Sequence, residues 1–363
     1  MKTNRALLAL ALLTLLAALW AGLLRIGWPW PPLQPMLPAA HGPLMVSGFL
    51  GTLIALERAV ALQKRAAYLV PLASGAGGLL LIGGFSWTWG SRLLLLGSVG
   101  LLLLFGVLLR RHRALHTGVM ALGAAAWLLG NGLLALGWPI YRAAPWWLAF
   151  LVLTIAGERL ELSRVLRLSA RVRGLFVAAT AVFLLALLLS LASYAAGMRA
   201  AGLGMLALAA WLLRYDIARR TIRRSGLTRY IAACLLSGYV WLGVGGVLAL
   251  VYGGVAAGPA YDAILHAVFL GFVFAMIFGH APIIFPAILG RPMAYRPIFY
   301  GHLALLHLSL VLRVLGDVAA FPALRRWGGL LNALVLLLFL ANTAVALRAT
   351  PKNGTRINTD DTD

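Results

Sequence analysis

The chain has 363 residues, of which 62% are hydrophobic and only 11% are charged, and its mean hydropathy is +0.94. Soluble domains carry roughly a quarter charged residues, so composition excludes an ordinary soluble domain and indicates a membrane protein. The net charge of +22 does not indicate nucleic-acid binding, because Lys and Arg form short clusters between apolar runs, as in loops that face anionic lipid.

Apolar runs of roughly 20 residues, the length that an α-helix needs to cross a bilayer, recur along the whole sequence. The first run follows Lys2 and Arg5 and resembles a signal peptide, but its length favours a retained helix. No linker divides the chain, so we expect residues 1–349 to form one domain and residues 350–363 a disordered polar tail. The pattern predicts an all-α integral membrane protein with twelve transmembrane helices, at about 6–24, 37–57, 66–85, 92–109, 114–136, 145–162, 174–195, 200–214, 230–252, 261–287, 298–316 and 327–347.

The positive charge is distributed unevenly between the two sides of this segmentation. About 24 of the 31 Lys and Arg residues fall at the N-terminus, in the even-numbered loops and in the tail. The positive-inside rule therefore places both termini in the cytoplasm. The Trp-rich and Pro-rich odd-numbered loops, such as residues 28–32, are then expected at the outer interface.

A weak internal repeat links three of the predicted helices. The second span ends in LIALERAVALQKR and the sixth in LTIAGERLELSRVLR, and each has a Glu-Arg pair at its cytoplasmic end. Four helices later, the tenth span carries Gly279-His280-Ala281-Pro282 at the equivalent depth. This spacing suggests three pseudo-symmetric groups of four helices.

Two histidines are predicted at the outer side of the membrane. His41 opens the second span and His266 lies near the start of the tenth, and both spans run inward. Imidazoles from two helices at one depth can bind a haem iron from both faces. Alternatively, His41 is an interfacial residue and His266 forms a hydrogen bond with Asp262, four residues earlier on the same helical face.

Three more histidines are candidate metal ligands, and two of them, His280 and His302, define a second, inner level. His280 lies fourteen residues beyond His266, which is about 21 Å along a helix. His302 enters the eleventh span from the cytoplasmic side, and His307 is turned by about 140° from it, so the two cannot both face one small centre. The short connection between the tenth and eleventh helices makes them antiparallel neighbours, and His280 and His302 are expected to approach each other there. Together they could bind a metal or share a hydrogen bond. Since Cys234 is the single cysteine, copper or another metal would depend on His, carboxylate or Met ligands.

The segment GHAPIIFP contains Pro282 and Pro286, which remove backbone donors near the end of the tenth helix. One interpretation is a shaped inner site. The other is a simple helix terminus that leads into the following loop. The prolines are also expected to end the regular helix early, which would bring His280 and His302 to within about one turn in depth.

Three carboxylates lie near cytoplasmic helix ends, each close to an arginine in the sequence: Glu57, Glu158 and Glu161. Carboxylates inside a membrane often mark proton or ion paths. The adjacent arginines Arg58, Arg159 and Arg164 favour structural ion pairs instead.

The twelve spans, the motif HGPLMVSGFLG at the start of the second helix and the histidines of the tenth and eleventh helices resemble the NnrS family of bacterial haem- and copper-associated membrane proteins. More remotely, they are similar to the catalytic subunit of the haem–copper oxidases. That resemblance implies three arcs of four helices and makes His41 and His266 the axial ligands of a low-spin haem. The sixth and seventh helices carry no histidine, and His266 and His280 replace a closely spaced pair, so an oxygen-reducing binuclear centre of the oxidase type is not expected.

From this resemblance we expect a haem-binding protein of a prokaryotic inner membrane that acts in electron transfer or in handling nitric oxide and nitrosative stress. An enzyme of this type would be a haem-dependent oxidoreductase, with a redox partner or a respiratory complex. One alternative is a secondary transporter with a broken-helix site at GHAPIIFP, with Glu57 and Glu158 coupled to protons. Another is a non-catalytic assembly factor for a respiratory complex.

Overall fold

The computed structural model describes residues 2–111 and 113–349, and that part of the chain consists of helices joined by short connections, without a β-strand. The predicted tail at residues 350–363 lies outside the described residues. Twelve helices are long and apolar enough to cross a membrane, which confirms the all-α fold class and the number of spans and indicates a multi-pass membrane protein.

Eight of the spans are single helices: α1 (Lys2–Arg25), α5 (Trp87–Arg111), α6 (Leu115–Ala135), α8 (Ala170–Ala192), α9 (Tyr194–Tyr215), α11 (Gly226–Tyr252), α14 (Phe299–Val318) and α15 (Pro322–Arg348). The other four are composite: η1, α2, η2 and α3 (Pro38–Leu62), η3 and α4 (Arg65–Gly83), α7 (Ile140–Leu162) with η4 (Ser163–Leu166), and α12, η5 and α13 (Pro259–Leu289). A short helix, α10 (Ala218–Thr221), lies between α9 and α11.

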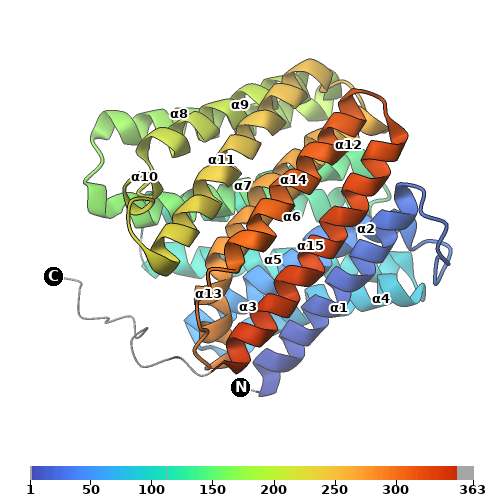
Figure 1. The fold of residues 1–363 in the computed structure, drawn as a ribbon, viewed down its shortest axis with the longest axis horizontal. Helices are drawn as coiled ribbons and strands as arrows, with labels where there is room; N and C mark the ends of the chain where they lie inside the picture. Colours follow the sequence, from blue (N-terminus) through green and yellow to red (C-terminus); the bar gives the residue numbers. More distant parts are fainter. Residues whose placement is uncertain (1, 112, 350–363) are drawn as a thin grey trace.

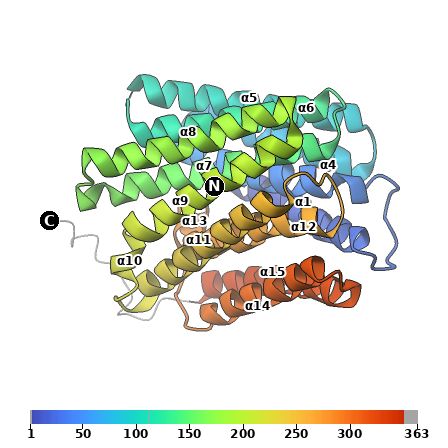
Figure 2. The same cartoon turned by 90° about the horizontal axis from the view of Figure 1, so that it is seen from above.

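The helices form one bundle, and Figure 2 shows the hairpin of α14 and α15 at one edge and α5, α6 and α8 at the opposite edge. Both ends of the described chain lie at the same end of the bundle (Figure 1). Asn4 Nδ2 donates to the carbonyl of Ile288 at 3.0 Å, and the amide of Ala294 donates to the carbonyl of Ala346 at 3.2 Å. Which end faces the cytoplasm, and whether the helices form three groups of four, stay predictions.

The tenth span continues through both of its prolines. Pro282 and Pro286 lie inside α13 (Ala275–Leu289), which ends where Gly290 adopts a left-handed backbone with φ of 64°. The prediction that the prolines end this helix early is wrong. Each proline removes only one hydrogen bond to an earlier carbonyl, whereas the left-handed conformation that glycine tolerates ends the helix.

Two helical segments are π-helical, and both directly follow the histidines of the outer level. Residues Leu44–Gly51 (η2) begin three residues after His41, and residues Ala267–Phe274 (η5) begin directly after His266. The rings of Phe49 and Phe274, one from each segment, have centres 6.2 Å apart and planes inclined by 20°. π-Helical turns are rare and often occur at functional sites. The two π-helical segments therefore indicate a functional site beside His41 and His266.

Candidate functional site

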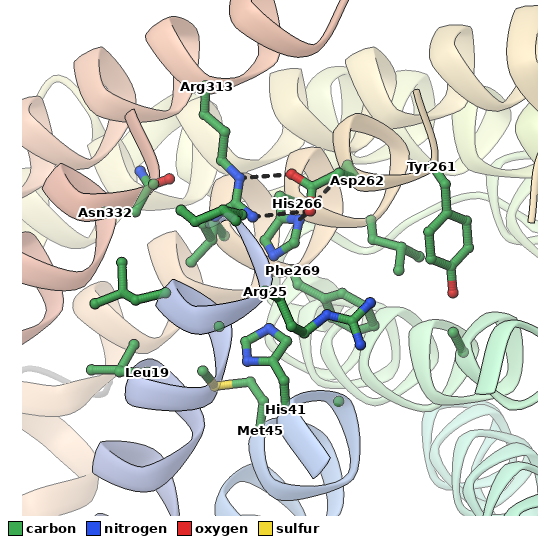
Figure 3. A pocket seen from close by; sticks show the side chains of 18 of the residues that line it. Leu19, Arg25, His41, Met45, Tyr261, Asp262, His266, Phe269, Arg313 and Asn332 are labelled. Carbon is green, nitrogen blue, oxygen red and sulfur yellow. Dashed lines mark hydrogen bonds and ion pairs between the residues drawn. The ribbon is translucent and has the colours of Figure 1, made fainter. Parts of the chain in front are cut away.

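His41 and His266 face each other across a cavity near the end of the bundle opposite the chain termini. His41 opens α2 (His41–Pro43) and His266 closes α12 (Pro259–His266). The centres of their rings are 6.2 Å apart, and the ring planes are inclined by 23°. Figure 3 shows the two imidazoles pointing toward one another from different helices. The structure thus brings together the two residues that the sequence places at one depth.

A backbone carbonyl fixes the tautomer of each ring. Nδ1 of His41 lies 2.8 Å from the carbonyl oxygen of Ala18, and Nδ1 of His266 lies 2.9 Å from that of Asp262. A carbonyl can only accept, so each Nδ1 carries the proton and each Nε2 keeps its lone pair. Among the described residues, no side chain or backbone group donates a hydrogen bond to either Nε2. The predicted hydrogen bond of His266 with Asp262 is therefore present, and it leaves Nε2 without a partner among the described residues.

Small residues make room for the ring of His41. A Cβ atom at Gly22 of α1 would lie 2.8 Å from Cε1 and 2.9 Å from Nδ1 of that ring. A Cβ atom at Gly42 would lie 3.3 Å from the indole of Trp147. Glycine at position 22 thus allows α1 to pack directly against the imidazole and to hold it in place.

Charged side chains surround the ring of His266. Arg313 of α14 donates to Asp262 with Nε at 2.8 Å and Nη2 at 3.0 Å, the two-point geometry that suits a carboxylate. Arg325 of α15 lies 3.7 Å from the same carboxylate and 2.7 Å from that of Asp317. Because Asp262 also contacts Nδ1 of His266, this cluster links α12, α14 and α15 to the position of the imidazole.

The cavity between the rings has a volume of about 190 Å³ and is open on one side. Its walls combine apolar side chains, among them Leu19, Met45 and Phe269, with the guanidinium groups of Arg25 and Arg313. Figure 3 shows Arg25 of α1 beside the gap between the two imidazoles. Within the described chain, Arg25 forms no ion pair with a carboxylate, so its charge is available to a bound anion.

The distance between the ring centres is compatible with two ligands of one metal when both Nε2 atoms point at that metal. An imidazole nitrogen bonds a first-row metal at roughly 2.0 Å and lies about 1.1 Å from the ring centre, so two such ligands have ring centres about 6 Å apart. The observed 6.2 Å agrees with this value. Two imidazole donors suit zinc, copper, iron and nickel.

The histidines of the predicted inner level differ from this pair. His302 contacts the hydroxyl of Tyr230 at 2.9 Å and the amide nitrogen of Asn342 at 3.2 Å, which occupies both of its ring nitrogens. His307 likewise uses both, with Ser237 at 2.9 Å and Trp241 at 3.0 Å. Both rings are thus bonded in the way that structural histidines inside a helix bundle are.

His280 resembles the outer pair in one respect, since its Nδ1 lies 2.8 Å from the carbonyl of Met276. In the part of the chain that the structure describes, however, no hydrogen bond joins His280 to His302. No group of three or more His, Cys, Asp or Glu side chains with metal-site geometry occurs among those residues either. The tenth and eleventh spans are nonetheless neighbours, as their short connection predicts. Metal binding at His280, His302 and His307 stays a prediction.

Two of the three predicted carboxylates form ion pairs, and the sequence predicts their partners only in part. Glu158 pairs with Arg58 of α3 (Thr52–Leu62), not with its neighbour Arg159. Adjacent residues point to different sides of a helix, and Arg159 instead donates to Asp216 at 2.9 and 3.1 Å. Glu161 lies 3.7 Å from Arg164, as predicted, and 3.6 Å from His116. Glu57 forms no ion pair within 4.0 Å among the described residues, and proton transfer by these groups stays a prediction.

Sequence reasoning missed the residues that support the outer pair. Arg25 and Arg325 lie near helix ends, where the positive-inside rule treats them only as minor outer charges, and Arg313 lies inside α14. A second group is a buried network in which Asn131 Oδ1 accepts from Ser47 Oγ at 2.7 Å and from Trp147 Nε1 at 3.0 Å. Both groups contain polar residues within apolar spans. Such a residue needs a buried partner, so its presence in the sequence could have predicted a contact at these positions.

A comparison with protein-family models matches residues 5–348 to a domain of unknown function, DUF8744. Comparisons with curated proteins and with solved structures gave no match. Because the family model spans nearly all of the described chain, the protein belongs to the family described as domain of unknown function DUF8744.

Proposed function

We propose that the cavity between His41 and His266 binds one haem, with Nε2 of each histidine as an axial ligand, and that the protein transfers electrons in a membrane. The observation that carries this proposal is the pair of facing imidazoles with ring centres 6.2 Å apart and both Nδ1 atoms bonded to carbonyls. Such carbonyl contacts orient metal-binding histidines and fix their tautomer.

The charges around the cavity favour haem over a bare metal ion. Arg25, Arg313 and Arg325 all line the cavity. The carboxylates that contact Arg313 and Arg325 are those of Asp262 and Asp317. Three arginines therefore face two aspartates, and the excess positive charge complements the anionic carboxylates at the edge of a haem. A bare metal cation would be repelled by the same excess charge.

The cavity is small for a haem. A volume of about 190 Å³ suits a small molecule, so a macrocycle requires lining side chains to change rotamer. The flexible side chains of Leu19 and Met45 lie on the wall and can move without a change of backbone. We therefore expect haem binding to repack this wall and leave the two histidines in place.

A haem with two histidine ligands supplies reversible one-electron transfer, because neither axial position is open to a substrate. This coordination supports electron transfer ahead of direct binding of nitric oxide. The resemblance to the NnrS family and the twelve-helix architecture support a place in a prokaryotic inner membrane, with a redox partner or respiratory complex. The continuous α13 removes the broken-helix feature that favoured a transporter.

The test is a visible absorption spectrum with metal analysis of protein purified after expression with ample haem supply. We expect a Soret band and about one iron per chain, with the band shifted or lost in His41→Ala and in His266→Ala. His307→Ala is the matched control, because that ring is fully bonded within the protein, and its spectrum should match wild type. Copper without a Soret band, lost in both outer variants, would assign the pair to copper. Absence of both metals would contradict the proposal.

A further inference from the structure

A second hollow in the protein is an open groove between α9, α10 and α11. Its volume is about 640 Å³, and its wall combines apolar side chains with Ser237 and two arginines. The apolar wall includes Ala210, Leu213, Leu236 and Val240, and the arginines are Arg214 and Arg219. Val240 is 53% exposed and belongs to a membrane-spanning helix, so the groove faces the lipid.

The two arginines stand together without a carboxylate partner. Nη1 of Arg219 donates to the backbone carbonyl of Arg214 at 3.2 Å, which holds the two residues side by side. Among the described residues, no Asp or Glu lies within ion-pair distance of either guanidinium. Two like charges at the edge of a bilayer repel each other, and an anion placed between them is stabilised by both.

The connection that carries Arg219 is anchored to the bundle. Asp216, which is only 2% exposed, pairs with Arg159 of α7 and accepts from the amide of Ala218 at 2.7 Å. Ser163 also contacts Asp216, at 3.4 Å. These contacts fix the start of α10, the short helix that carries Arg219 and directly follows α9 (Figure 1).

We propose that this groove is a binding site for an anionic phospholipid of the surrounding bilayer. The phosphate lies against Arg214 and Arg219, and one acyl chain follows the apolar wall toward Val240. The arginines end the groove at the end of the bundle where the chain termini lie, and they continue into the exposed Arg220, Arg223 and Arg224. Basic pockets between helices at a membrane surface bind anionic lipid headgroups in this way. This site is separate from the proposed haem site and does not depend on it.

Native mass spectrometry of the full-length protein in detergent tests this site, with phosphatidylglycerol and phosphatidylcholine of equal chain length as probes. We expect one tightly bound phosphatidylglycerol in wild type and affinity lower by about tenfold or more in Arg214→Gln/Arg219→Gln. Arg223→Gln/Arg224→Gln is the matched control, because it removes the same charge from the same connection outside the groove, and it should bind as wild type does. Inorganic phosphate should not displace the lipid, since it lacks the acyl chain.

A second variant tests the apolar wall. Val240→Trp fills the groove with the arginines unchanged, and it should weaken phosphatidylglycerol binding even if the double arginine variant fails to fold. Equal losses in the two arginine pairs would show a general attraction to basic loops and overturn the proposal. Equal affinity for phosphatidylcholine, full binding in Val240→Trp, or displacement of the lipid by phosphate would overturn it as well.

Discussion

Gly22 of α1 lies directly against the imidazole of His41, so close that a Cβ atom at position 22 would come within 2.8 Å of ring atom Cε1. The same turn of α1 provides the carbonyl of Ala18 that fixes the tautomer of the ring. One face of α1 therefore sets both the position and the protonation of a proposed ligand.

Gly22→Ala should displace the ring of His41 and weaken its bond to Ala18. We expect a shifted or weakened Soret band with little loss of stability, because alanine favours a helix by up to about 1 kcal/mol over glycine. Gly106→Ala is the control, since a Cβ at Gly106 of α5 meets no atom within 4 Å. Its spectrum should be unchanged and its thermal midpoint equal or higher. A normal spectrum in Gly22→Ala would show that α1 does not position the ring.

Asn131→Leu should destabilise the protein because it removes the centre of the buried network. Ser47 and Trp147 would lose their acceptor, and the carbonyl of Leu94 would lose its donor at 3.0 Å. Buried polar groups left without partners cost about 1–3 kcal/mol each, so we expect a loss of roughly 3 kcal/mol and a lower thermal midpoint.

Thr180→Val is the control for Asn131→Leu. The hydroxyl of Thr180 is buried and has no hydrogen-bond partner among the described residues, so its loss should be neutral or stabilising. Equal thermal midpoints for the two variants would contradict the network's structural role.

Asp216→Asn should be among the most damaging single changes on the α7 side of the bundle. It leaves the guanidinium of Arg159, only 3% exposed, without its counter-charge. Breaking one side of a buried pair typically costs 3–5 kcal/mol, and we expect a loss of about that size in chemical denaturation.

Glu161→Gln is the matched control for Asp216→Asn, because Glu161 is 41% exposed and its ion pair with Arg164 is solvated. Its effect should stay below about 1 kcal/mol. Comparable losses of unfolding free energy in Asp216→Asn and Glu161→Gln would contradict a stabilising role for the burial of the Asp216–Arg159 pair.

His302→Ala should lower stability without changing bound metal. The ring is 1% exposed and packs edge-on against Phe278 with centres 4.8 Å apart, so its removal leaves a cavity and two polar groups without partners. We expect a loss of about 3 kcal/mol with an unchanged metal content and spectrum. A lower metal content in His302→Ala than in wild type would instead support the predicted inner metal site.

The sequence predicted the number of spans because a bilayer demands apolar segments of fixed length. It misplaced some helix starts, as at Pro145, which lies inside α7, since a proline in a helix is read as a boundary. The depth of His41 and His266 followed from counting residues, because both spans run in the same direction from the same surface. The distance of 6.2 Å between their ring centres could not be derived from counting residues. It depends on which helices are neighbours and on how each is rotated, and packing between distant segments decides both.

The same limit explains the other differences between prediction and structure. The π-helical segments after both histidines have no signal in the apolar pattern, which is nearly continuous there. The partner of Glu158 is Arg58 rather than the adjacent Arg159, because contacts between helices decide which neighbour a side chain meets. Asp262 was identified as a contact of His266, but its pairing with Arg313 needed the fold to bring α12 and α14 together.

The most direct test of the central claim is near-infrared magnetic circular dichroism of the oxidised, haem-loaded protein, which identifies the axial ligands of a ferric haem. We expect the charge-transfer band of a low-spin haem with two imidazole ligands in wild type and in His302→Ala. We expect loss of that band in both His41→Ala and His266→Ala. Retention of the bis-imidazole band in either outer variant, or wild-type protein that takes up no haem, would contradict the assignment of His41 and His266 as the ligands.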